Sequence, residues 1–316
     1  MQKFIYADMH CDSVTVCCDG GGDLSDFCGQ VNTTKLNGSG CAAQCFALFT
    51  QGENAAKDFE RYLAFYNAQI AKDPKILPVY RYSDLVSAQK SGRTGAILTV
   101  ENAGFLEGDA RGFARLKKAG VRMASLVWNY ANRFAFPNLI FNGNLPDFTA
   151  REERGLTAAG KAAVEEINAQ KIILDISHLS DGGVDDALEI SRAPIVASHS
   201  NCQSVCAVSR NLTDCQIKKI ADKGGVVGLN FCRDFIGGED EFGALYNHYA
   251  HLVKTGGEGV AALGSDFDGI PAYPRLADCS KVAALLEYFS SRGVSGEALE
   301  KLAFKNFFRV FKEVVG

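Results

Sequence analysis

The chain has 316 residues, of which 47% are hydrophobic and 22% are charged, a composition that excludes an extended disordered protein. Its 33 basic and 37 acidic residues give a net charge of −4 without a basic run, which excludes the electrostatic surface of a nucleic-acid or anionic-membrane binder. No stretch reaches the roughly 20 apolar residues of a membrane span, and the start "MQKFIYADMH" lacks the apolar core of a secretory signal. We therefore expect a cytoplasmic protein whose partners are small molecules.

Eight short apolar runs recur along the chain, and a stretch with helical periodicity follows each of them. Their near-continuous apolar character is typical of strands that are buried on both faces, and strand–helix alternation favours a parallel sheet. The runs cover residues 3–10, 41–50, 95–102, 121–129, 171–178, 193–200, 224–231 and 260–267. Eight such units predict an α/β fold of the (β/α)8 TIM-barrel type, which typically takes about 250 residues. No linker is visible, so we predict a single domain over residues 1–316.

The helical stretches include residues 53–72 and 157–170, with Thr157 as a predicted N-cap of the second. A final helix over 295–315 carries an apolar stripe of Leu299, Leu302, Phe307, Val310 and Phe311. Residues 129–156 instead form a long connection rich in Asn, Pro and Phe, and connections of that length are usually functional or mobile. We predict a lid there. The eleven cysteines are scattered without a C-x-x-C pair, which favours reduced thiols that pack as small apolar groups.

Three of the five histidines, His10, His178 and His199, fall at the ends of predicted strands. The acids Asp12, Glu101 and Asp266 occupy matching strand ends. In a barrel these ends converge on one mouth, where barrel enzymes carry their chemistry. Imidazole nitrogen and carboxylate oxygen together suit zinc, and a carboxylate can bridge two ions about 3.5–4 Å apart. Each residue alone could be a hydrogen-bonded structural residue, but their joint placement predicts a two-metal site.

The other two histidines, His248 and His251, are three residues apart on a predicted helix. We expect them to lie on the surface or behind the site and not to bind metal.

The motifs "HCD" (10–12), "VEN" (100–102), "LDISHLSD" (174–181), "VASHSN" (196–201), "VSRNLTD" (208–214) and "GSDFDG" (264–269) occur in this order. Together they resemble the membrane (renal) dipeptidase family of zinc peptidases, over essentially the full chain. The two histidine motifs, the R-N-L-x-D segment and the D-F-D-G segment are the most specific. "KNFFRVF" near the end is similar to the closing helix of the family.

The resemblance implies a (β/α)8 barrel with two zinc ions that hydrolyses the peptide bond of small dipeptides by a metal-bridging hydroxide. It implies that one ion is held by His10, Asp12 and Glu101, and the other by Glu101, His178 and His199. Asp266 would lie close to the first ion and take the proton of the bridging water. Arg210, with its neighbour Asn211, would bind the terminal carboxylate of the substrate, and a D-residue on that side could be accepted. Mn²⁺ or Co²⁺ could occupy the same ligands, and the family suggests a homodimer.

Two departures from the family pattern bear on the substrate. The mammalian enzymes carry a histidine after the fourth strand, whereas this chain has Trp128, which donates one hydrogen bond and accepts no proton. A tyrosine expected after the seventh strand corresponds to Phe235, so Arg210 would bind the carboxylate with less support. We therefore expect Trp128 and Phe235 to contact the substrate in place of polar groups.

Other functions fit the same residues less well. A binuclear metal hydrolase of another small amide or lactam would use the same site, and a non-catalytic binder could retain the barrel. "SAQK" (87–90) and "KTG" (254–256) match two motifs of serine acyl-transfer enzymes, but no S-D-N lies between them. A metal-dependent dipeptidase of the bacterial, cytoplasmic type is the function that the sequence predicts.

Overall fold

The structure is a computed structural model and describes residues 4–316. Lys3, the first residue of the predicted first strand, and the predicted start of the domain at residue 1 lie outside the described residues.

Eight parallel strands follow one another around a barrel in the order β1-β2-β4-β5-β8-β9-β10-β11. The ring closes where the Met9 amide donates to the Leu263 carbonyl at 3.0 Å, between the first and last strands. The strands are β1 (Tyr6–Asp8), β2 (Cys41–Phe49), β4 (Thr94–Glu101), β5 (Met123–Ser125), β8 (Ile173–Asp175), β9 (Val196–Ala197), β10 (Val226–Leu229) and β11 (Ala261–Leu263). Seven of them lie within the predicted runs and β4 begins one residue before its run, at Thr94, so the predicted α/β barrel is confirmed.

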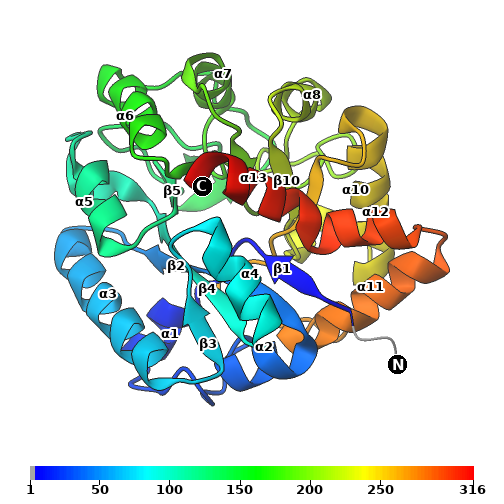
Figure 1. Cartoon of the computed structure of the whole chain (residues 1–316). Helices are drawn as coiled ribbons and strands as arrows, with labels where there is room; N and C mark the ends of the chain where they lie inside the picture. The colour runs from blue at the N-terminus through cyan, green and yellow to red at the C-terminus, as the bar shows by residue number, and fades with distance from the viewer. Residues whose placement is uncertain (1–3) are drawn as a thin grey trace.

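The helices surround this barrel, as Figure 1 shows. They are α1 (Ser13–Asp19), α2 (Thr33–Ser39), α3 (Ala55–Lys72), α4 (Tyr82–Lys90), α5 (Gly112–Ala119), α6 (Ala158–Ala169), α7 (Asp181–Ile190), α8 (Asp214–Asp222), α9 (Arg233–Ile236), α10 (Glu241–Gly256), α11 (Val282–Ser291), α12 (Gly296–Glu300) and α13 (Asn306–Val315). Three further strands were not predicted: β3 (Ile76–Pro78), which pairs with β4, and the antiparallel pair β6 (Ile140–Asn142) and β7 (Leu145–Asp147).

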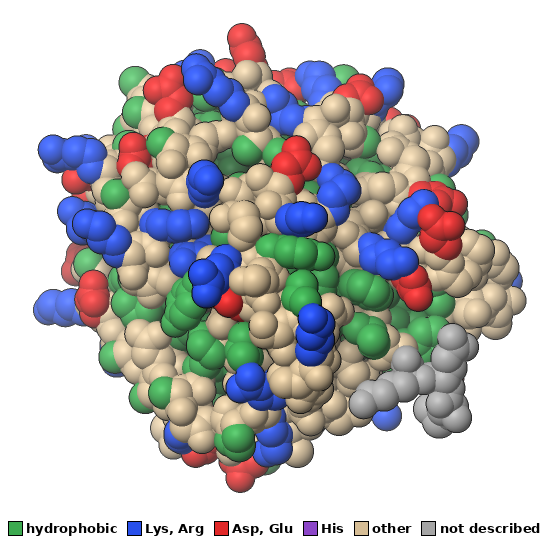
Figure 2. All heavy atoms as spheres, in the orientation of Figure 1, with side chains coloured by type: hydrophobic (Ala, Val, Ile, Leu, Met, Phe, Trp, Pro, Cys, Tyr) green, Lys and Arg blue, Asp and Glu red, His purple; other side chains and the backbone are tan. Residues whose placement is uncertain are grey.

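Helix α13 crosses the end of the barrel at which the strands begin (Figure 1). It packs Phe307, Val310 and Phe311, all essentially fully buried, against the first residues of the strands, such as Ile173 and Val226. Figure 2 shows this face from outside, with hydrophobic side chains gathered around its middle among Lys and Arg side chains. We call this end the base. Burial of large apolar side chains, each worth about 1.5–3 kcal/mol, stabilises it.

Two glycines allow the strands to approach closely inside the barrel. A Cβ atom on Gly228 of β10 would lie 2.1 Å from the Ser198 carbonyl oxygen, and one on Gly264 would lie 1.7 Å from the same atom. Any side chain at these positions would push apart β9, β10 and β11, which carry functional residues at their ends.

Local capping sets the start of α6 as the sequence predicts. The Thr157 hydroxyl accepts from the Gly160 amide and begins α6. The predicted final helix is interrupted, because residues Lys301–Lys305 form a π-helical segment between α12 and α13. The predicted apolar stripe is nevertheless buried along its whole length.

Candidate active site

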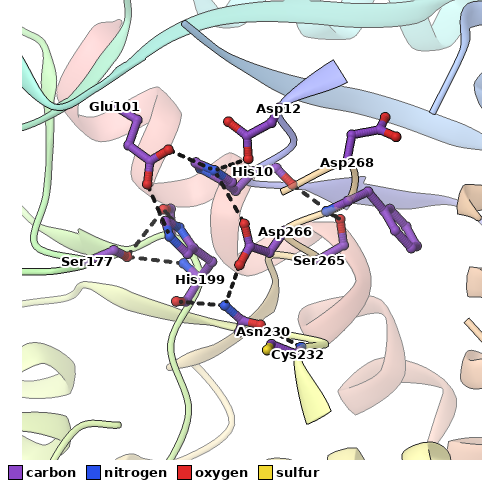
Figure 3. Close-up of polar contacts among 12 residues, drawn as sticks. His10, Asp12, Glu101, Ser177, His199, Asn230, Cys232, Ser265, Asp266 and Asp268 are labelled. Carbon is purple, nitrogen blue, oxygen red and sulfur yellow. Dashed lines mark hydrogen bonds and ion pairs between the residues drawn. The ribbon is translucent and has the colours of Figure 1, made fainter. Parts of the chain in front are cut away.

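The strand ends opposite the base form a mouth at which the predicted histidines and acids meet. His10 follows β1, and its Nε2 lies 3.4 Å from Asp12 Oδ2, 3.6 Å from Glu101 Oε2 and 3.7 Å from Asp266 Oδ1. Figure 3 shows these side chains converging, with Asp12 and Glu101 on one side of His10 and Asp266 on the other. These groups come from the first, third and eighth strands of the ring, so only barrel closure brings them together.

The second oxygen of Glu101 faces the other two histidines. Glu101 Oε1 lies 2.9 Å from His178 Nε2 and 3.6 Å from His199 Nε2. The two Nε2 atoms are themselves 2.9 Å apart. Glu101 therefore presents one oxygen to His10 and the other to His178 and His199, the geometry of a carboxylate between two cation positions.

The opposite ring nitrogens of these two histidines are already bonded to the protein. His178 Nδ1 lies 2.9 Å from Asn129 Oδ1, an acceptor, so Nδ1 carries the proton and Nε2 is left with a lone pair. His199 Nδ1 lies 2.7 Å from Ser198 Oγ, whose hydroxyl donates to Asp175 at 2.5 Å. Because the Ser198 hydroxyl already donates to Asp175, its oxygen accepts the proton of His199 Nδ1, and the lone pair of His199 is left on Nε2. Fixed tautomers of this kind are typical of histidines that bind metal.

Two buried carboxylates beneath the mouth hold the strand ends. Asp175 accepts from the amides of Ser177 and Ser198, and Asp8 accepts from the amides of His10 and Ser265 and from the Ser265 hydroxyl. Neither residue is among the predicted site residues. A signal was present, because an acid inside an otherwise apolar run precedes a histidine in both "DMH" and "DISH".

The backbone at the mouth departs from relaxed conformations. His178 and Asp266 both have positive φ, 71° and 67°, which is uncommon for residues other than glycine and is concentrated at functional sites. Gly269 lies against the acids, because a Cβ atom there would be 2.3 Å from Asp12 Oδ2 and 2.7 Å from Asp266 Oδ1. This glycine was also not predicted, and it leaves room beside the carboxylates.

Burial controls the protonation of the cluster. Burial raises the pKa of Glu101 well above its usual value, and the nearby Asp12 and Asp266 carboxylates act in the same direction. Burial also raises the pKa of Asp266 and lowers those of His178 and His199. For His10, burial opposes the charge, but Glu101 and Asp12 outweigh it and raise its pKa to about 10. Burial thus disfavours the charged forms of these carboxylates, and a bound cation would stabilise them.

The donor atoms fit divalent metal ions. Two groups, His10–Glu101–His199 and His10–Asp12–Asp266, each offer ligand atoms within 4.8 Å of one another. His10 Nε2 and Asp12 Oδ1 are buried and have no hydrogen-bond partner in the described part of the chain. Orphaned buried polar atoms are costly, and a metal ion would satisfy both.

A cavity of about 560 Å³ opens above this cluster, within the size range of small-molecule sites. Arg210 is the one lysine or arginine among the lining residues. It is buried, and its Nη1 has no partner in the described chain, while Nη2 lies 3.2 Å from His178 Nε2. Burial lowers the pKa of Arg210, an effect that Asp266 and Glu101 oppose. A buried guanidinium with free donor positions is suited to a carboxylate.

Trp128 and Phe235 both line the cavity. Phe235 lies under the Arg210 guanidinium, with 5.3 Å between Cζ and the ring centroid. Trp128 packs edge-on against Phe49 at 4.8 Å between centroids. Both positions are therefore apolar walls of the cavity, and their contact with the substrate stays a prediction.

Asn211 does not line the cavity. Its Nδ2 donates to the carbonyls of Cys206 and Phe235, so it joins the loop that carries Arg210 to the loop that carries Phe235. His248 is buried behind these loops, where Nδ1 accepts from the Cys202 amide and Nε2 donates to the Ile236 carbonyl. His251 is paired with Asp214 at 2.7 Å. Neither of these histidines reaches the cluster of histidines and acids at the mouth.

Residues 129–156 cover one side of the mouth. The hairpin β6–β7 contributes Phe141, Pro146 and the following Phe148 to the cavity lining. The hairpin is bonded to the site on both of its flanks: the Asn138 amide donates to the His178 carbonyl, and the Phe148 carbonyl accepts from the Ser209 amide. The hairpin therefore forms one wall of the cavity and is attached to the loops that carry His178 and Arg210.

A parallel barrel with imidazoles, carboxylates and an arginine at its mouth defines a metal-dependent hydrolase. Comparison with known proteins identifies the family: the model of membrane dipeptidase (peptidase family M19) matches residues 1–315. The chain belongs to the membrane dipeptidase family of metallopeptidases.

Individual relatives agree with this assignment. An uncharacterized dipeptidase of Schizosaccharomyces pombe is 32% identical over 237 residues, which are 73% of this chain and 56% of that protein. The crystal structure of a metallopeptidase of family M19, dipeptidase AC, superposes with a TM-score of 0.92 at 25% identity over 100% of both chains. A Rhodobacter sphaeroides metallopeptidase, liganded with a phosphinate mimic of L-Ala-D-Ala, has a TM-score of 0.90 at 24% identity over 99% and 100% of the two chains.

Two further predictions can be compared with the structure. All eleven cysteines are unpaired thiols. Within residues 4–316, none of the helices is long and apolar enough to span a bilayer.

Proposed function

We propose that this metallopeptidase is a dipeptidase that uses two zinc ions to hydrolyse small dipeptides with a free C-terminal carboxylate. The observation that carries the proposal is the position of Glu101, whose two oxygens face two separate groups of nitrogen and oxygen donors. His10, Asp12 and Glu101 would hold one ion, and Glu101, His178 and His199 the other. Bound metal ions lower the pKa of a coordinated water and polarise the scissile carbonyl.

The chain's own residues supply the remaining steps. Asp266, whose Oδ2 accepts from Asn230 Nδ2 at 3.0 Å, is held beside the cluster and would accept the proton of the attacking water at its other oxygen. Arg210 would bind the substrate carboxylate through the free Nη1 and so orient the dipeptide in the cavity. The buried walls of the mouth exclude bulk water and strengthen both interactions.

Hydrolysis by chelator-stripped enzyme, with and without two equivalents of zinc, tests the proposal. The panel should contain L-Ala-L-Ala, L-Ala-D-Ala and the amidated L-Ala-L-Ala. The D-residue is included because the Rhodobacter structure holds a mimic of L-Ala-D-Ala. We expect zinc to restore cleavage of the free-acid dipeptides, including the L,D pair, with two zinc ions per chain by elemental analysis. Two bound metals without cleavage of any dipeptide would indicate a hydrolase of another small amide or lactam.

The carboxylate contact has its own test. Arg210→Ala should raise the KM for free-acid dipeptides at least about 30-fold, because loss of one partner of a buried charge pair costs about 2 kcal/mol or more. The amidated dipeptide should be affected much less. Arg133→Ala is a matched control, because Arg133 is exposed and lies in the segment over the mouth outside the cavity lining. An equal rise in KM for the free-acid and the amidated dipeptide would contradict binding of the substrate carboxylate by Arg210.

We also propose that residues 129–156 act as a lid. The segment lines the cavity with apolar side chains, and its hairpin tip carries Leu145, which is 74% exposed. Hydrogen exchange of the β6–β7 amides should slow when a dipeptide phosphinate binds. Unchanged exchange would contradict closure. A homodimer remains a prediction that light scattering would test.

A further inference from the structure

Four aromatic side chains form a continuous wall on one side of the cavity. We define this aromatic wall as Phe49, Trp128, Tyr130 and Phe141, all of which line the cavity. Neighbouring ring centroids are 4.8 Å apart for Phe49–Trp128, 6.0 Å for Trp128–Tyr130 and 5.0 Å for the stacked pair Tyr130–Phe141. The wall begins beside the proposed metal ligands, where the ring centroids of Trp128 and His178 are 6.2 Å apart. It ends at the β6–β7 hairpin.

The Phe49 end of the aromatic wall stands across the mouth from Arg210. Phe49 ends β2, whereas Arg210 follows β9, and these strands are four places apart in a ring of eight. Phe49 is also the register partner of Glu101 in the β2–β4 pair. The proposed metal ligands therefore lie between the wall and the arginine. A dipeptide, which spans about 7 Å when extended, would lie across the cluster with its carboxylate at Arg210 and its N-terminal residue toward the wall.

We propose that the aromatic wall binds the side chain of the N-terminal residue and selects dipeptides in which that side chain is large and apolar. This inference rests on the proposed function, because the direction of the substrate follows from the carboxylate at Arg210. Apolar area removed from water provides the preference. Acidic N-terminal side chains are disfavoured, because a carboxylate would lose its hydration against the apolar wall and Arg210 is already used.

Steady-state kinetics on zinc-loaded enzyme with Phe-Gly, Leu-Gly, Ala-Gly and Glu-Gly tests the selection. We expect kcat/KM for Phe-Gly and Leu-Gly to exceed that for Ala-Gly by about tenfold or more, as burial of a large apolar side chain allows. Glu-Gly should be cleaved more slowly than Ala-Gly. Equal values for Ala-Gly and Phe-Gly would overturn this inference while leaving the dipeptidase proposal intact. Failure to cleave any dipeptide would overturn both.

Variants locate the effect in the wall. Trp128→Ala should lower kcat/KM for Phe-Gly by about tenfold and reduce the Phe-Gly to Ala-Gly ratio toward one. Tyr130→Ala should lower the ratio less, and because Tyr130 is 51% exposed, this variant is expected to fold even if Trp128→Ala does not. Tyr80→Ala is the matched control, a tyrosine that is 49% exposed and lies outside the cavity lining. A ratio that stays at the wild-type value in Tyr130→Ala and Trp128→Ala would overturn the assignment.

Discussion

The two ends of the barrel are built from the same eight strands but have opposite properties. At the base, Phe307, Val310 and Phe311 of α13 are buried in apolar contacts. At the mouth, His178 and Asp266 have positive φ, and buried polar atoms of several side chains lack hydrogen-bond partners among the described residues. The base therefore stabilises the fold, whereas the mouth holds groups in arrangements that cost stability and suit catalysis.

The largest expected effect is at the mouth, for Asp266→Asn. We expect kcat to fall by about 10²–10⁴-fold, because the amide cannot accept the proton. Both metal ions should be retained in elemental analysis. The free energy of unfolding should change little, because asparagine tolerates the positive φ of this position.

His178→Ala, in contrast, should lose one of the two ions. Full activity of Asp266→Asn, or retention of both ions by His178→Ala, would reverse these roles.

At the base the opposite result is expected for Phe311→Ala. Removal of this fully buried ring should lower the free energy of unfolding by about 3–5 kcal/mol in urea denaturation. The kcat/KM of the folded fraction should stay at the wild-type value, because α13 covers the end of the barrel away from the cavity. A large loss of kcat/KM at full folding would show that the two ends are coupled.

A smaller effect, dependent on pH, is expected behind the mouth. Burial lowers the pKa of His248 to about 4, so in acid the unfolded chain binds a proton that the folded chain does not. Stability must then fall as the pH falls from about 6.5 toward 4. The His248 contribution between pH 7.5 and pH 5 is about 2 kcal/mol. Urea denaturation of wild type and His248→Gln at both values checks this, and identical pH dependences would contradict it.

The smallest effect is expected at the rim of the mouth. Leu145 is exposed at the hairpin, and Leu145→Ser should change the free energy of unfolding by less than about 0.5 kcal/mol. Thermal denaturation of Leu145→Ser and Phe311→Ala compares the loss of stability when an apolar side chain is removed at each end of the barrel. A loss of several kcal/mol would mean that the hairpin contributes to the core.

Much of the fold could be predicted because its signals are local. Continuous apolar runs identified the eight barrel strands, and Thr157 marked the start of α6. The π-helical turn at Lys301–Lys305 was missed, since its residues keep the same apolar spacing as the helix around it. The β6–β7 hairpin was missed as well, because strands of only three residues, none of them buried, are too short to show an alternating pattern.

Part of the site could be predicted from the sequence for the same reason. Strand ends converge in any closed parallel barrel, so the placement of His10, Glu101, His178 and Asp266 at such ends predicted that they would meet. Asp8 and Asp175 were missed because a buried acid within a strand looks like an interruption of the apolar run until its partners are known. Asn211 was expected at the substrate, but its amide donates to the carbonyls of Cys206 and of Phe235 in α9.

The fold class, the family and the residues that lie at the mouth could be predicted from the sequence, because they depend on patterns a few residues long and on motif order. The oxygen of Glu101 that faces each histidine, the free nitrogen of each imidazole and the continuous aromatic wall on one side of the cavity depend on the tertiary structure. Those facts depend on contacts between residues far apart in the chain, such as the 3.7 Å approach of His10 and Asp266. Closure of the barrel creates these contacts, and no local pattern encodes their distances.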